Sequence, residues 1–312
     1  MSAGGGTRAI IAALLANLGI AVSKFVAFLF TGSSSMLAES VHSVADTSNQ
    51  GLLLLGRRRA QREVTAQHPF GYGRERYFYA FVVAVVLFTV GSVFSFYEGW
   101  HKISDPHPIE APAWAFGVLT VAIVLEAFSF RTAIVESNHV RGGLSWVAFV
   151  RRAKAPELPV VLLEDLAALL GLIFALLGVT LSVVTHSAVW DGIGTMAIGA
   201  LLGIVAIVLA IETKSLLIGE SAGRETERRI VAALQDVTEV DRVIHLKTLH
   251  LGPEELLVAA KIAVSHGDSA AEIARGIDVA EERIRSAVPI ARVIYLEPDL
   301  YREHQEEPQP SA

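Results

Sequence analysis

The chain has 312 residues, of which 52% are hydrophobic and only 19% are charged. Charged residues make up about a quarter of a typical soluble domain, so this deficit indicates a membrane protein. The formal net charge is −6, with the acidic residues concentrated in the last third. The sequence contains no cysteine, which excludes disulfides, thiolate nucleophiles and cysteine metal sites, and leaves His, Asp and Glu as metal ligands.

Six stretches are long and apolar enough to cross a bilayer, which takes about 20 mainly apolar residues. These predicted spans cover residues 10–30, 36–55, 77–100, 114–135, 159–184 and 190–211. From Lys214 onward, charged residues are frequent and apolar runs are short. We therefore predict a transmembrane domain over residues 8–214, a cytoplasmic domain over 215–303 and a disordered tail over 304–312.

The loops between the predicted spans alternate in positive charge, which predicts the orientation of the chain. Basic residues follow the second and fourth spans: Arg57, Arg58, Arg59, Arg62, Arg74, Arg76, Arg141, Arg151, Arg152 and Lys154. The loops at 31–35 and 185–189, on the other side, contain neither Lys nor Arg. Because basic loops face the cytoplasm, both termini are expected there.

The second span carries Glu39, His42 and Asp46, whose spacings of three and four residues place them on one face of a helix. Ionisable residues inside a bilayer are costly and are functional candidates. Imidazole and carboxylate together suit a divalent metal such as zinc. The alternative is that these groups only hydrogen-bond to neighbouring helices, but His four residues before Asp in a span favours the metal.

Other charged residues also fall within the predicted spans. Lys24 lies about six residues from its helix end and is expected to extend outward to the interface. Glu126, in the middle of the fourth span, is either a structural partner or a proton or metal relay. Glu164 and Asp165 are adjacent in the fifth span, so they point about 100° apart and one of them can face a cavity. This acidic pair supplies oxygen ligands that the second span lacks.

The residue pattern after Lys214 predicts a small soluble domain with the element order αββαβ. The amphipathic spacing of residues 225–236 and 269–288 predicts two helices, the second opened by Asp268-Ser269. Residues 243–251, 256–264 and 292–297 are predicted strands, the first two joined by a turn at Gly252-Pro253. This order predicts an α+β, ferredoxin-like domain with an open sheet and helices on one face.

Three segments together resemble the cation diffusion facilitator family: TGSSSMLAESVHSVADTSNQ through span two, HPFGYGRERYFYAF entering span three, and LLEDLAALLG in span five. The resemblance covers nearly the whole chain and is greatest for the branch that includes the mitochondrial zinc exporter of animals. It implies a homodimeric divalent-cation/proton antiporter with a transport site shared between spans two and five. His42 and Asp46 match the ligands of span two, and Asp165 matches the second ligand of span five.

The sequence also departs from the family pattern. Many members have a His four residues before the span-five Asp, where this chain has Val161, so Glu164, Glu39, Asn17 or water would provide the fourth ligand. A site with one His is less selective for zinc, which leaves manganese and iron as alternatives. The regulatory His positions of the tail fall on Ile244, Lys261 and Leu296, so the tail is interpreted mainly as a dimerisation domain.

The resulting hypothesis is efflux of a divalent metal cation, with Zn²⁺ favoured, by proton-coupled antiport through alternating access. The metal is the substrate, no prosthetic group and no nucleic-acid partner are expected, and the metal candidates are His42, Asp46, Asp165, Glu164 and Glu39. The short start and the family branch favour a bacterial inner membrane. The alternatives are a transporter of another class and a non-transporting scaffold or metal sensor acting through the tail. Enzymatic activity is not expected, because the sequence has no nucleophile–base pair and no phosphate-binding glycine loop.

Overall fold

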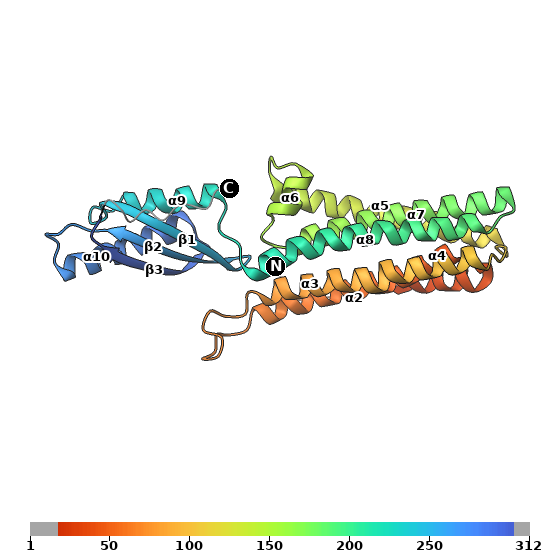
Figure 1. Ribbon diagram of the computed structural model, residues 1–312, viewed down its shortest axis with the longest axis horizontal. Coiled ribbons are helices and arrows are strands. Elements are labelled where there is room, and N and C mark those ends of the chain that lie inside the picture. Colours follow the sequence, from red (N-terminus) through yellow and green to blue (C-terminus); the bar gives the residue numbers. More distant parts are fainter. Residues whose placement is uncertain (1–17, 303–312) are drawn as a thin grey trace, which may run out of the picture. The chain divides into compact units, whose positions relative to one another are not determined.

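The computed structural model describes residues 18–302 and divides into two compact units (Figure 1). The helical unit contains the described residues up to Arg58 together with Arg76–Lys214. The sheet unit contains Arg59–Glu75 and the described residues from Ser215 onward. The predicted disordered tail at 304–312 lies outside the described residues, as do residues 8–17 of the predicted transmembrane domain.

The helical unit has a helical element at each of the six predicted spans. In chain order these are a helix over Leu18–Thr31, α2 (Ser34–Ala60), α3 (Glu75–Val86) with the π-helix η1 (Leu87–Val93) and α4 (Phe94–Ser104), α5 (Pro112–Arg141), α7 (Glu157–Thr185) and α8 (Val189–Ile218). A short helix, α6 (Trp146–Arg152), precedes α7.

Four of these segments have both the length and the hydropathy of membrane spans: Glu75–Ser104, Pro112–Arg141, Glu157–Thr185 and Val189–Ile218. α2 has 27 residues and so is about 40 Å long, which is enough to cross a bilayer. Its polar residues make its hydropathy lower than that of these four segments. Leu18–Thr31 is the described part of the first span. The predicted multi-pass helical architecture is therefore confirmed.

The third span packs directly against α8 through glycine and serine residues. Ser92, within the π-helix η1, donates a hydrogen bond from Oγ to the carbonyl oxygen of Gly199 at 2.7 Å. A Cβ atom on Gly99 would lie 2.8 Å from the carbonyl oxygen of Gly192, and one on Gly192 would lie 2.9 Å from that of Gly99. Small residues allow two helices in a membrane to approach this closely, because no side chain separates their backbones.

Gly192→Val is expected to destabilise the helical unit by about 1–3 kcal/mol, because overpacking forces the two backbones apart. Thermal unfolding in detergent measures this loss. Gly117→Val in α5 is the matched control, since a Cβ on Gly117 meets no atom within 4 Å. Equal melting temperatures for the two variants would contradict the close packing of the third span on α8.

The sheet unit has the predicted order αββαβ. It comprises α9 (Arg224–Gln235), β1 (Arg242–Gly252), β2 (Glu255–Ala263), α10 (Ala270–Ala287) and β3 (Ala291–Asp299). The strand order is β1-β2-β3; β1 and β2 are antiparallel, and β2 and β3 are parallel with α10 as their crossover. Buried apolar side chains of the strands and of both helices form one core. α10 begins with a capping box in which Ser269 and Glu272 satisfy each other's backbone N–H groups.

The loop between α2 and α3 groups with the sheet unit rather than with the helices that it joins. A Cβ on Gly73 of this loop would lie 2.6 Å from the carbonyl oxygen of Leu251 and 3.0 Å from Cα of Gly252. The loop backbone thus lies directly against the end of the β1–β2 hairpin. The domains predicted from the sequence placed this loop in the transmembrane domain, residues 8–214, whereas in the structure it groups with the sheet unit.

Candidate metal centre

The N-terminus of α2 is anchored by Asp191, a fully buried residue in the first turn of α8. Its carboxylate accepts hydrogen bonds from Ser33 Oγ at 2.8 Å, Ser34 N at 2.8 Å and Ser35 Oγ at 2.6 Å. A carboxylate at this position satisfies otherwise unpaired N–H groups and interacts favourably with the positive end of the helix dipole. Asp191 therefore fixes the start of the helix that carries the polar stripe.

The sequence analysis did not identify Asp191 as an anchor. The local signal was available, because an acidic residue opens an otherwise apolar span and three consecutive serines open another. The pairing itself joins residues 156 to 158 positions apart, and local patterns do not reveal such long-range contacts.

His42 and Asp46 lie one turn apart on α2, as predicted from their spacing. His42 is 1% exposed, and its Nε2 lies 3.3 Å from Asp46 Oδ2. This distance is short enough for an ion pair, yet within the described residues neither ring nitrogen of His42 has a hydrogen-bond partner. Asp46 Oδ1 likewise has none there. Buried polar groups are normally hydrogen-bonded, so these unsatisfied atoms point to a ligand.

Glu39, the third member of the stripe, forms a buried ion pair with Lys24. Lys24 Nζ lies 3.0 Å from Glu39 Oε2 and donates a second hydrogen bond to Ser43 Oγ at 2.8 Å. Lys24 is 1% exposed, so the expectation that it extends outward to the interface was wrong. The acidic partner on α2 holds the ammonium inside the helical unit, because an unpaired charge there would be costly.

Lys24→Met is expected to destabilise the helical unit by roughly 3–5 kcal/mol, because it leaves Glu39 buried without its cation. Glu39→Gln should also be destabilising, whereas the double variant Lys24→Met/Glu39→Gln should recover most of the loss, since no unpaired charge remains. Thermal unfolding of all four proteins in detergent completes the double-mutant cycle. Simple addition of the two single effects would contradict the ion pair.

Glu164 and Asp165 of α7 point to different partners, as expected for adjacent residues of a helix. Glu164 Oε1 accepts a hydrogen bond from Asn49 Nδ2 of α2 at 2.7 Å. Asp165 Oδ2 accepts one from Ser129 Oγ of α5 at 2.9 Å. Both carboxylates thus join α7 to neighbouring helices.

Asp46 and Asp165 line the same small polar cavity. Its lining residues are Ile20, Ser43, Asp46, Gln50, Glu126, Ser129 and Asp165. The cavity volume is about 30 Å³, which is roughly the volume of one water molecule. His42 lies beside Asp46 but does not line the cavity, and Glu39 and Glu164 do not line it either.

The structure therefore brings Asp46 and Asp165 together, with His42 next to Asp46, and leaves Glu39 and Glu164 in contacts of their own. Among residues 18–302, no three His, Asp or Glu side chains are close enough together to hold an ion without moving. Rotation of His42 and the carboxylates is required to form a complete set of ligands. Asn17, another predicted ligand, lies outside the described residues.

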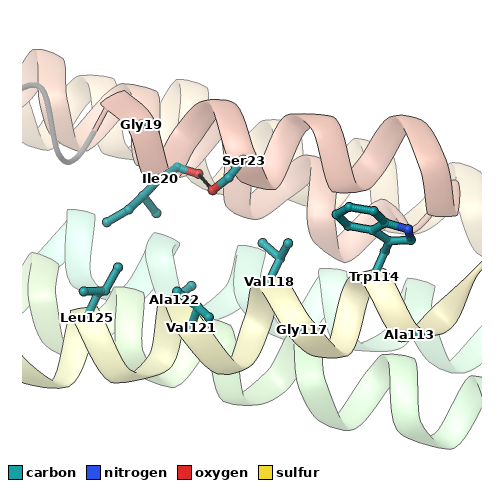
Figure 2. A pocket seen from close by; sticks show the side chains of 10 residues that line it. All are labelled: Gly19, Ile20, Ser23, Ala113, Trp114, Gly117, Val118, Val121, Ala122 and Leu125. Carbon is teal, nitrogen blue, oxygen red and sulfur yellow. Dashed lines mark hydrogen bonds between the residues drawn. The ribbon is translucent and has the colours of Figure 1, made fainter.

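A second cavity, between the helix Leu18–Thr31 and α5, has a different chemical character. Its volume is about 590 Å³ and Figure 2 shows its lining of mainly apolar side chains, among them Trp114, Val118 and Leu125. Its polar side chain, Ser23, donates a hydrogen bond to the carbonyl oxygen of Ile20 at 2.8 Å. This lining provides no ligand set for a cation.

Two histidines of the sheet unit, His245 and His250, lie on strand β1. His250 is buried, with Nδ1 3.3 Å from the carbonyl oxygen of Gly252. His245 is opposite Lys261 in the β1–β2 register. Lys261 pairs with Glu297 at 2.9 Å and Asp299 at 3.1 Å, and these hydrogen bonds raise the pKa of Lys261. The positive charge at Lys261 disfavours a metal beside His245.

The chain is similar to a family of cation efflux proteins and to named members of it. The family described as "Cation efflux transmembrane domain" matches residues 10–218. The "Proton-coupled zinc antiporter SLC30A9, mitochondrial" of Homo sapiens is 33% identical over 241 residues, covering 77% of this chain and 42% of that protein. "Metal tolerance protein C4" of Arabidopsis thaliana is 30% identical over 257 residues, covering 82% of this chain and 56% of that protein.

A bacterial relative matches over more of its own length. "Magnetosome protein MamB" of Paramagnetospirillum magneticum is 23% identical over 291 residues, covering 91% of this chain and 90% of that protein. The chain spans less than half the length of the mitochondrial zinc antiporters that it matches.

Proposed function

The chain belongs to the cation efflux family, near the branch of the mitochondrial zinc antiporter, and we propose that it exports a divalent metal cation, Zn²⁺ foremost, in exchange for protons. The matched antiporters are transporters rather than enzymes, in keeping with the absence of a nucleophile–base pair from the sequence. Residues 8–214 would form the transport domain, and residues 215–303 a cytoplasmic domain.

The observation that carries the proposal is the meeting of Asp46 from α2 and Asp165 from α7 at one small polar cavity that is partly open to the surface. His42 Nε2 lies 3.3 Å from Asp46 Oδ2 and has no hydrogen-bond partner within the described residues, so rotation of the imidazole would add it to these carboxylates. One imidazole and two carboxylates form a ligand set that Zn²⁺ accepts. The oxygen-rich set also suits manganese and iron, so Zn²⁺ is favoured by the relatives rather than by ligand type.

Proton coupling follows from the chemistry of the same ligands. His42 must be neutral, and the carboxylates ionised, to bind a metal. Metal binding therefore releases protons, and proton binding releases the metal. Alternating exposure of this site to the two sides of the membrane converts the competition into antiport, with no covalent step.

The remaining parts of the proposal concern assembly and location. The cytoplasmic domain would serve homodimer formation, and the basic loops would keep both termini in the cytoplasm. The match to a bacterial relative over most of both chains supports a bacterial inner membrane. Glu39 and Glu164 would contribute charge and helix contacts around the site.

Uptake of metal into proteoliposomes with an imposed pH gradient tests the proposal. The full chain should transport zinc when the pH gradient is present, and the rate of zinc uptake should fall when the gradient is collapsed. Manganese and iron should be tested at the same concentration as zinc. Metal movement that is insensitive to the pH gradient would contradict antiport. No movement of any metal would instead favour a scaffold or sensor acting through the sheet unit.

A further inference from the structure

Three helices each contribute one carboxylate to the small polar cavity of the helical unit. Asp46 comes from α2, Asp165 from α7 and Glu126 from α5. A volume of about 30 Å³ accommodates roughly one water molecule, or one ion of similar size. Glu126 is thus a third carboxylate at the position proposed for the transported cation.

Glu126 is held at the cavity by its own helix. Glu126 and Ser129 are three residues apart on α5 and so lie on the same helix face. Ser129 Oγ donates a hydrogen bond to Asp165 Oδ2 at 2.9 Å, which fixes this face of α5 against the ligand-bearing part of α7. The position of Glu126 at the cavity follows from this contact.

A buried histidine beside the cavity provides separate evidence for a ligand. His42 is 1% exposed, neither of its ring nitrogens has a hydrogen-bond partner in the described part of the chain, and its Nε2 faces Asp46 Oδ2. A group of carboxylates alone could be a solvated acidic cluster. A desolvated, unsatisfied imidazole next to them indicates a cation that binds nitrogen and oxygen together.

The other acidic residues of the region are held by different partners. Glu39 is paired with Lys24 at 3.0 Å, and Glu164 accepts a hydrogen bond from Asn49 at 2.7 Å. To reach the cavity, either carboxylate would have to leave a buried polar partner unsatisfied, which is unfavourable. Glu126 already lines it.

We infer that Glu126 supplies an oxygen ligand to the transported divalent cation. After His42 and the carboxylates rotate toward the cavity, Glu126 completes a four-ligand set with His42, Asp46 and Asp165. The inference rests on the proposed function. It gives α5 a direct role in the transport site, where the sequence has Val161 at the position of a histidine ligand.

The absence of cysteine from the chain permits a direct test, because Glu126→Cys introduces a single thiol. Thiolate is a soft ligand that favours cadmium over zinc. Titration of the purified full-length variant with cadmium should produce cadmium–thiolate absorption in the ultraviolet at one ion per chain, and the ratio of cadmium to zinc affinity should rise at least tenfold. Glu136→Cys, exposed on the same helix and absent from the cavity lining, is the matched control.

A second measurement uses zinc alone. Isothermal titration of Glu126→Gln should show zinc affinity reduced by 10-fold or more, with Glu136→Gln unchanged. If Glu126→Gln does not fold, the cadmium titration of Glu126→Cys still decides the question. If Glu126→Cys binds one cadmium ion per chain without cadmium–thiolate absorption, the inference is overturned. Unchanged zinc affinity in folded Glu126→Gln would overturn it as well.

Asp46→Ala separates failure of the inference from failure of the proposed function. If Asp46→Ala abolishes zinc binding while Glu126→Gln leaves it intact, the proposed site stands and Glu126 is not a ligand. If both variants bind zinc as the wild type does, the proposed function itself is contradicted at this site.

Discussion

Asp165→Asn should abolish proton-driven zinc uptake, with a loss on the order of a hundredfold or more. The substitution preserves the shape of the side chain and can still accept the hydrogen bond from Ser129, but it removes the negative charge that binds the cation. Even residues that only orient metal ligands contribute about 10- to 100-fold to metal affinity, so a direct ligand should contribute at least as much. Asp46→Asn should have the same effect, because its carboxylate lines the same cavity.

The control for these variants is Asp105→Asn, which makes the same chemical change at a side chain that is 70% exposed and does not line the cavity. Its initial rate of zinc uptake should equal that of the wild type. Thermal unfolding of each variant separates a lost ligand from a lost fold. Near-normal uptake by a well-folded Asp46→Asn or Asp165→Asn protein would exclude that residue as a ligand.

Asp191→Asn should destabilise the helical unit by on the order of 3 kcal/mol or more, because hydrogen bonds to a charged group are worth about 1.5–3 kcal/mol each. Asp191 accepts such bonds from Ser33, Ser34 and Ser35, and asparagine has one acceptor oxygen where the carboxylate has two. The measurement is the melting temperature in detergent, again against Asp105→Asn.

Folded Asp191→Asn is expected to bind zinc with near-normal affinity. Asp191 positions the start of α2, whereas the ligands His42 and Asp46 lie two to three turns further along the helix. A normal melting temperature would contradict the anchoring role. A normal melting temperature together with lost zinc affinity would instead place Asp191 among the metal ligands.

The sequence predicted those features that depend on local pattern. Apolar stretches of about 20 residues identified the spans. In the tail, the spacing of apolar residues and the turn residues identified α9, β1, β2, α10 and β3 in order. The spacing of Glu39, His42 and Asp46 gave the polar face of α2, because i, i+3 and i+4 positions share a side of any helix. Asp268-Ser269 marked the start of α10, where the structure has Ser269 as the N-cap.

The sequence did not predict the contacts that join distant segments. Lys24 and Glu39 are 15 residues apart, and only the packing of their helices decides that the ammonium points inward. The third span contacts α8 through the hydrogen bond from Ser92 to Gly199, and Gly73 of the loop at Arg59–Glu75 lies against the β1–β2 hairpin of the sheet unit. The meeting of Asp46 and Asp165 was expected from family resemblance, whereas the presence of Glu126 at their cavity required the structure.

Isothermal titration of zinc into the detergent-solubilised full-length protein shows whether α2 and α7 share one metal site. We predict saturable binding in the wild type that is lost in Asp46→Asn and equally lost in Asp165→Asn, with Asp105→Asn unchanged. Zinc binding that survives both substitutions, and disappears only when residues 215–312 are removed, would contradict a shared site between α2 and α7 and assign the metal to the sheet unit.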